Sequence, residues 1–117
     1  MLVFPEISSS TKEAYALVDQ KLLCGTDDDF VVFDSLEEEY RKNPSDWRFK
    51  NTFTPSLCGV YSDLGAALGT LKNSGADFCD MSGSGSTLYG VFTSKQRAKS
   101  NMKLLAATWN CALVRLL

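Results

Sequence analysis

The sequence predicts an α+β domain of the ferredoxin-like (split β-α-β) type, with an antiparallel four-stranded sheet and helices packed on one face. Two observations lead to this prediction. Short apolar runs and stretches with helical spacing follow the order strand, helices, strand, strand, helix, strand. The 117 residues are 44% hydrophobic and show no internal repeat, which fits a single domain, residues 1–117, with its own core.

Capping residues mark the expected helices. A Ser followed three residues later by Glu forms a capping box, and a lone Ser can also accept from the first turn. The expected N-caps are Ser10 with Glu13, Ser35 with Glu38, and Ser94. The first two helices should end at Gly25 and Asn43-Pro44, and the last should present Trp109 on its apolar side. A further helix carries apolar residues from Val60 to Leu71 and ends at Gly75.

The expected strands are short apolar stretches. They are residues 2–4, 76–81, 88–92 and 111–117. Gly90 inside the third strand predicts the close approach of another backbone. Residues 46–55 show no regular pattern, and Asp27 to Asp29 lack the spacing of a calcium-binding loop, so we expect a solvated turn there.

Charge and composition exclude several functions. The net charge of −2 argues against nucleic acid or an anionic membrane as a partner. The absence of His removes Ser-His-Asp and Cys-His catalysis. Four dispersed cysteines with no Cys-x-x-Cys pair predict buried thiols, although disulfides stay open, and no metal site. The start of the chain is too short for a signal-peptide core and no apolar run could span a membrane, so we expect a cytoplasmic protein.

The most distinctive stretch is the glycine loop, residues 82–86, between the second and third expected strands. A P-loop would need Lys and then Ser or Thr after the last Gly, and a dinucleotide fingerprint would need a helix to begin there. Neither is present. Such a loop can form a nest of backbone N–H groups for an anion, let another backbone approach closely, or serve as a flexible Ser/Gly turn.

Four motifs in order resemble the GHMP kinases, the superfamily of galactose, homoserine, mevalonate and phosphomevalonate kinases. They are Ser10-Thr11-Lys12-Glu13-Ala14-Tyr15 behind a Val-x-Pro strand, Asn51-Thr52-Phe53, Gly75-Ala76, and Met81-Ser82-Gly83-Ser84-Gly85-Ser86-Thr87 followed by Tyr89-Gly90-Val91-Phe92. The resemblance spans nearly the whole chain. Within the superfamily it is nearest to members that phosphorylate a cytidine diphosphate derivative in non-mevalonate isoprenoid biosynthesis.

The resemblance implies a substrate-side C-terminal domain of a kinase that transfers the γ-phosphate of ATP to an alcohol. The superfamily's catalytic Lys and Asp and its Gly-Leu-Gly-Ser-Ser motif belong to an N-terminal domain with no match here. No catalytic residue is therefore assigned. ATP and Mg would be cofactors of the parent enzyme and would not bind this chain alone. Its partners would be the small-molecule substrate and the missing N-terminal kinase domain.

The resemblance also implies roles for individual residues. It places Ser82, Gly83, Ser84, Gly85 and Ser86 beside the phosphate loop of the missing domain, where small side chains would let the two loops pack together. It places Thr11 and Tyr15 at the substrate pocket, although both could simply belong to the first turns of a capped helix. The acidic residues of the family's middle motif are Thr52 and Thr54 here, which leaves them without a role. The alternative function is a stand-alone ferredoxin-like ligand-binding or regulatory module.

Overall fold

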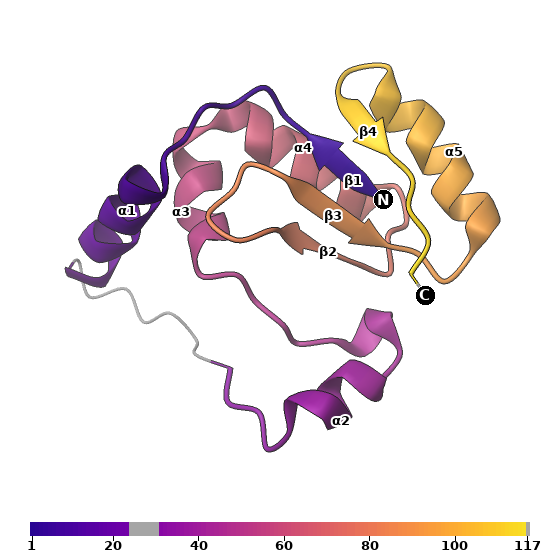
Figure 1. Ribbon diagram of the computed structural model, residues 1–117, viewed down its shortest axis with the longest axis horizontal. Helices are drawn as coiled ribbons and strands as arrows, with labels where there is room; N and C mark the ends of the chain where they lie inside the picture. Colours follow the sequence, from indigo (N-terminus) through magenta and orange to yellow (C-terminus); the bar gives the residue numbers. More distant parts are fainter. Residues whose placement is uncertain (24–30, 117) are drawn as a thin grey trace.

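A computed structural model describes residues 1–23 and 31–116 (Figure 1). The elements in chain order are β1 (Leu2–Phe4), α1 (Thr11–Leu23), α2 (Leu36–Arg41), the 3-10 helix η1 (Pro44–Asp46), α3 (Phe53–Val60), α4 (Ser62–Asn73), β2 (Phe78–Met81), β3 (Leu88–Val91), α5 (Lys95–Ala106) and β4 (Asn110–Ala112). The expected helix end at Gly25 and the turn at Asp27 to Asp29 lie outside the described residues.

The four strands form one antiparallel sheet in the order β2-β3-β1-β4 (Figure 1). The first strand therefore lies inside the sheet, where Val3 is paired with Leu88 on one side and Cys111 on the other. This is the sheet order of a split β-α-β fold, and it confirms the predicted fold class.

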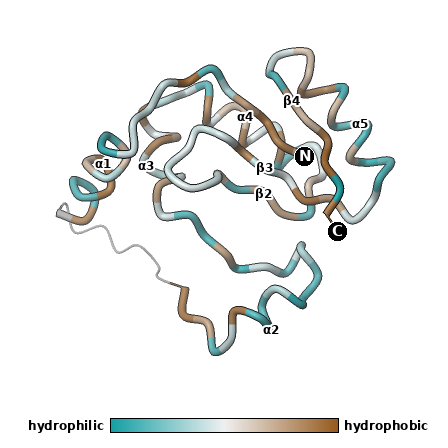
Figure 2. Tube along the Cα trace, in the orientation of Figure 1, coloured by the Kyte–Doolittle hydropathy of each residue, from teal (hydrophilic) through white to brown (hydrophobic). Residues whose placement is uncertain are grey.

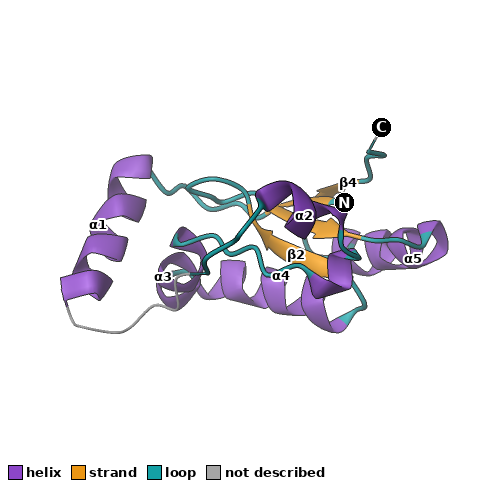
Figure 3. Ribbon diagram, turned by 90° about the horizontal axis from the view of Figure 1, so that it is seen from below, coloured by secondary structure: helices purple, strands orange, loops and turns teal. Residues whose placement is uncertain are grey.

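Helices α4 and α5 cover one face of the sheet (Figure 3). Side chains alternate across a strand, so Met81 and Leu88 point to this face and are buried. The core between sheet and helices contains Val3, Ala14, Leu57, Leu64, Ala67, Leu71, Met81, Leu88 and Leu105. Helix α1 packs against α3 at the end of the sheet where β2 turns into β3 (Figure 1).

On the opposite face, aromatic side chains from the segment before α3 pack against β2, while α2 of the same segment lies beyond the β2 edge of the sheet (Figure 1). The rings of Trp47 and Phe49 lie edge-on against Phe78 of β2, with centroids 5.5 and 6.5 Å apart. Phe78 in turn contacts Tyr89 of β3 at 6.1 Å. The helices of the split β-α-β unit thus share one face, and an aromatic layer closes part of the other.

Hydropathy follows this arrangement (Figure 2). Helices α2 and α5 are largely hydrophilic, whereas β1 and the stretch after β4 are hydrophobic. Within the described ranges, 1–23 and 31–116, the protein has no helix both long and apolar enough to pass through a membrane.

The three predicted N-caps are confirmed. The hydroxyls of Ser10, Ser35 and Ser94 accept from the backbone N–H three residues later, at 3.1 to 3.3 Å. The return bond of the first capping box is replaced, because Glu13 accepts from the hydroxyl of Tyr61 instead. Gly75, at φ 103°, follows the end of α4, as a C-terminal glycine should.

Four expectations about elements were wrong. Residues 46–55 are not irregular throughout, because α3 begins at Phe53 and Pro55 lies in its first turn, where the missing N–H costs nothing. The last strand is only Asn110–Ala112, and Trp109 lies beyond the end of α5. At Gly90 the Met1 backbone pairs in the plane of the sheet, but the atom that leaves no room for a Cβ is in the side chain of Leu71, 2.7 Å from the position of an added Cβ.

Candidate functional site

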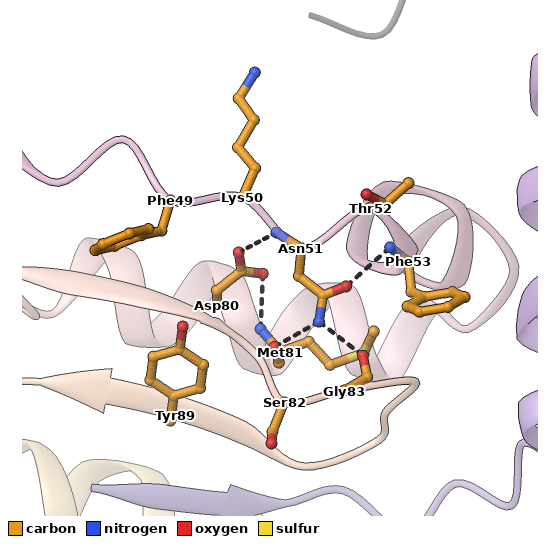
Figure 4. Close-up of a pocket in the computed structure, with 10 residues that line it drawn as sticks. All are labelled: Phe49, Lys50, Asn51, Thr52, Phe53, Asp80, Met81, Ser82, Gly83 and Tyr89. Atoms are coloured by element: carbon orange, nitrogen blue, oxygen red, sulfur yellow. Dashed lines mark hydrogen bonds between the residues drawn. The ribbon is translucent and has the colours of Figure 1, made fainter. Parts of the chain in front are cut away.

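A pocket of about 510 Å³ opens beside the glycine loop (Figure 4). Its walls come from three parts of the chain: the segment before and into α3, the end of β2 with the start of the loop, and Tyr89 of β3. The lining residues are Phe49, Lys50, Asn51, Thr52, Phe53, Asp80, Met81, Ser82, Gly83 and Tyr89. The side chain of Lys50 extends away from the other labelled side chains (Figure 4).

The glycine loop is a tight connection with two left-handed glycines. The Ser82 N–H donates to the Thr87 carbonyl at 2.8 Å, and the Gly85 N–H donates to the Ser82 carbonyl at 3.1 Å. Gly83 has φ 57° and Gly85 has φ 92°, conformations that favour glycine. Ser82 and Gly83 are exposed, and the rest of the loop is half-buried.

The two glycines face different surroundings. A Cβ added at Gly83 would meet nothing within 4 Å, whereas at Gly85 it would lie 2.7 Å from the Met81 sulfur and 3.4 Å from Leu57 Cδ1. The added Cβ at Gly85 would thus point toward the chain's own core, while the place of residues 82–86 beside a second loop stays a prediction. The lack of a side chain at Gly85 makes room for the domain's own core.

The structure brings Thr11 to the glycine loop. The hydroxyls of Thr11, at the start of α1, and Ser84 are 3.1 Å apart. On the other side of the loop, the Ser86 hydroxyl donates to the Ile7 carbonyl at 3.1 Å, which ties the loop to the connection between β1 and α1. The N-terminal connection and the loop thus form one polar surface next to the pocket.

Tyr15 lies one turn further along α1, and its side chain is exposed. Its ring stands edge-on to that of Phe53, with centroids 5.0 Å apart. Because Phe53 lines the pocket, Tyr15 is one residue removed from the pocket wall.

Two polar residues at the centre of the site were not assigned a role from the sequence. The Asp80 side chain, buried at 9% exposure, accepts from the backbone N–H of Asn51 at 2.8 Å, from the backbone N–H of Met81 at 2.7 Å and from the hydroxyl of Thr54. The carboxamide of Asn51 donates to the carbonyls of Met81 and Gly83. The available signals were an Asp inside an otherwise apolar strand and an Asn two residues before the first residue of a helix.

The hydroxyl of Tyr89 and three thiols are shifted toward their neutral forms. Burial, together with the charge of Asp80 and a smaller effect of Cys79, raises the pKa of Tyr89, so its hydroxyl keeps its proton at neutral pH. Burial raises the pKa of the Cys58, Cys79 and Cys111 thiols. These three cysteines are free and partly buried, whereas Cys24 lies outside the described residues. In the described part of the chain, no three acidic or Cys side chains are grouped to hold a metal ion.

The arrangement is suited to binding. It presents an aromatic wall, hydroxyl groups and exposed loop backbone around one pocket, and both oxygens of its buried carboxylate accept hydrogen bonds from the chain itself. A carboxylate held in this way positions the backbone around it.

Comparison with known proteins identifies the relatives of this chain. No family model matches it. Over 123 aligned residues it is 31% identical to the 4-diphosphocytidyl-2-C-methyl-D-erythritol kinase of Treponema pallidum, with the same result for each of two strains, and the alignment covers 99% of this chain and 42% of the kinase. It is 28% identical over 120 residues to the kinase of the same name from Thermodesulfovibrio yellowstonii, covering 100% of this chain and 42% of that protein.

The chain thus spans less than half the length of these relatives, and the match runs from one end of the chain to the other. The expected resemblance to GHMP kinases is confirmed, and the antiparallel α+β fold is consistent with it. The protein is homologous to the C-terminal part of the 4-diphosphocytidyl-2-C-methyl-D-erythritol kinases, which are GHMP kinases.

Proposed function

We propose that this chain is the substrate-side domain of a kinase that transfers the γ-phosphate of ATP to an alcohol, 4-diphosphocytidyl-2-C-methyl-D-erythritol, in cytoplasmic isoprenoid biosynthesis by the non-mevalonate pathway. The observation that carries the proposal is the match of 99% of the chain to curated kinases of that name. The pocket beside an exposed glycine loop supports it, because it offers a binding surface next to a loop open to a second domain.

In this proposal the chain positions the substrate, and an N-terminal domain supplies ATP and Mg. Phosphoryl transfer depends on placing the acceptor hydroxyl in line with the phosphate and on stabilising the charge that develops. Residues 82–86 would pack beside the phosphate loop of that domain. Thr11 would contribute a hydroxyl hydrogen bond to the substrate, and Tyr15 an aromatic contact.

The first prediction is that the 117-residue chain alone does not phosphorylate 4-diphosphocytidyl-2-C-methyl-D-erythritol. The reason is that groups for holding ATP and Mg have no match in its sequence. A coupled ATP-turnover assay on the purified chain measures this. Turnover above background would show that the chain contains catalytic groups of its own.

A chimera tests the positive side of the proposal. The chain replaces the matched 42% of the Treponema pallidum kinase, and the chimera is expected to phosphorylate the alcohol. Gly83→Val in the same chimera should lower turnover about a hundredfold, because a displacement of about 1 Å at the reacting groups has an effect of that size. A folded chimera without activity would contradict the proposed function.

The alternative is a stand-alone ligand-binding or regulatory module. The observation that favours it is that the chain by itself forms a pocket of about 510 Å³ with an aromatic wall. Under this alternative the isolated chain would bind a cytidine diphosphate ligand with the same affinity as the chimera, and the chimera would be inactive. Isothermal titration of both proteins with cytidine diphosphate separates the two functions.

A further inference from the structure

The side chain of Asn51 joins three parts of the site. Its Nδ2 donates to the Met81 carbonyl and to the Gly83 carbonyl, both at 2.7 Å (Figure 4). Its Oδ1 accepts from the Phe53 N–H at 2.9 Å, at the first residue of α3. One carboxamide therefore fixes the end of β2, the first half of the glycine loop and the start of α3 relative to one another.

The backbone of Asn51 is held independently of its side chain. The Asn51 N–H donates to Asp80 Oδ2 at 2.8 Å, while the other oxygen of Asp80 accepts from the Thr54 hydroxyl and from the Met81 N–H. Because the Asp80 carboxylate is buried, these charge-assisted bonds are shielded from water and hold their geometry firmly. The backbone of Asn51 is thus held in place by Asp80, and its carboxamide in turn holds the loop through the carbonyls of Met81 and Gly83.

Gly83, whose carbonyl accepts from Asn51, has open space on its other side. The residue is also exposed, with free space where a side chain would be. An exposed loop with two glycines would otherwise sample several conformations, because glycine restricts the backbone least. The contact with Asn51 therefore limits the backbone at the point where a second domain would meet it.

We propose that Asn51 is a positioning residue, which holds the first half of the glycine loop in register with the pocket wall so that the phosphate and the bound alcohol meet in one geometry. The inference rests on the proposed function for its catalytic consequence, but its structural part can be measured in the chain alone. The carboxamide is required because both loop contacts need a donor, while the contact with α3 needs only an acceptor.

Two variants separate these contacts. Asn51→Asp and Asn51→Ser both keep an oxygen that can cap α3. Neither can replace the two donors to the loop, because aspartate has no donor and the shorter Ser side chain has only one. Asn51→Ser adds no charge beside Asp80, so it distinguishes the lost donors from charge repulsion. The matched control is Asn43→Asp at the exposed N-cap of η1, where Oδ1 only accepts, from the Ser45 N–H at 3.4 Å.

Amide hydrogen exchange of the 117-residue chain provides the first measurement. The amides of Ser82 and Gly85 are bonded within the loop, and we expect both to exchange at least about tenfold faster in Asn51→Ser and Asn51→Asp. The Asp77 amide, bonded to Val91 at the other end of the hairpin, should not change, and Asn43→Asp should alter none of the three. Unchanged exchange at Ser82 and Gly85 in a folded Asn51→Ser chain would overturn the inference.

Kinetics of the active chimera provide the second measurement. Asn51→Ser should lower kcat about tenfold or more while KM for the alcohol changes less than about threefold, since the loop contact aligns reacting groups and does not itself hold the alcohol. A change confined to KM would overturn the positioning role. An inactive unsubstituted chimera would instead contradict the proposed function, and hydrogen exchange would still decide whether Asn51 holds the loop.

Discussion

At the scale of single residues, the glycine loop contains two glycines with different tasks. Both have positive φ, so a β-branched side chain is strained at either position by about 1–3 kcal/mol. Only Gly85 also faces the core, where an added Cβ would press on Met81 and Leu57. Gly83 is open on that side, so its need for a small side chain can come only from its own backbone or from a partner.

This difference gives a prediction for the isolated chain. Gly85→Val should lower the free energy of unfolding by the strain of the backbone plus about 1–3 kcal/mol for overpacking, and therefore by more than Gly83→Val. Urea unfolding of the two variants measures the difference. Equal losses would mean that the core relaxes around the new side chain at residue 85.

A control variant separates strain from bulk at Gly83. Asn tolerates the left-handed conformation, and φ 57° lies in that region, so Gly83→Asn should leave stability nearly unchanged. In the chimera the same substitution places a side chain on the open face. Reduced turnover with unchanged stability would indicate that a second domain packs there.

At the scale of elements, α2 has an unusual orientation. It buries Glu39 at 2% exposure and leaves Leu36 and Tyr40 64% and 60% exposed. The Glu39 carboxylate accepts from the backbone N–H of Arg48 at 2.8 Å and from the Arg48 guanidinium at 3.1 Å. It also accepts from Lys42 Nζ at 2.7 Å. Leu36 and Tyr40 are four residues apart and share a face of the helix, but the ion pairs of Glu39 determine which side turns inward.

The pKa of Glu39 leads to a prediction about pH. The hydrogen bonds from Arg48 and Lys42 lower that pKa from its ordinary value of 4.5 to about 2. A carboxyl whose pKa is lower in the folded state stabilises the fold fully above pH 4.5, and this contribution is lost as the pH falls toward 2. The stability advantage of the wild type over Glu39→Gln should therefore shrink between pH 4.5 and pH 2.

The matched control is Glu37→Gln. Glu37 pairs with Arg41 on the same helix, but both side chains are exposed, so this pair should contribute little at any pH. Denaturant titrations of the three proteins across this pH range make the comparison. If the stability difference between the wild type and Glu39→Gln does not change with pH, the folded state does not lower the pKa of Glu39, and the prediction is wrong.

The elements that were predicted correctly have local causes. A Ser hydroxyl caps the N–H three residues later, and Gly75 ends α4 with a positive φ, so a few neighbouring residues determine these features. Pro55 fell in a stretch expected to be irregular, because its place in the first turn of a helix depends on where α3 begins. The last strand is shorter than expected, because it can pair only along its partner β1, which has three residues. The apolar pattern of residues 111–117 does not show that limit.

In the candidate site, too, features with local causes could be predicted and features that depend on distant partners could not. The glycine loop could be found from composition, because positive φ requires particular residues. Asn51 and Asp80 could not be joined from the sequence, since their bond connects positions 29 residues apart across the fold. Buried polar pairs of this kind depend on which elements meet, and short-range patterns carry no information on that.

At the scale of the whole molecule, the described residues form a flattened body with extents of 44 × 36 × 22 Å. Thr11 and the exposed part of the glycine loop lie at the same end of the sheet, beside α1 and α3 (Figure 1). If this end of the sheet meets the N-terminal domain of the proposed kinase, Thr11 and the exposed part of the glycine loop should be covered in the complete enzyme.

Hydrogen exchange can test this placement. The Gly83 amide should exchange more slowly in the chimera than in the isolated chain, because a covering domain excludes water. The Thr93 amide lies beyond the other end of the hairpin and donates to Asp77 at 2.7 Å, so it should not change. Equal exchange of Gly83 in the two proteins would place the domain contact elsewhere.

The inner position of β1 affects how the protein is made. Its neighbours in the sheet are β3 and β4, so residues 2–4 leave the ribosome long before either partner exists. An apolar strand that is unpaired during synthesis can form non-native contacts or aggregate. Pairing between strands far apart in the sequence is also slow. The sheet can be completed only after Asn110–Ala112 has emerged, so β1 is the segment that a chaperone would protect until then.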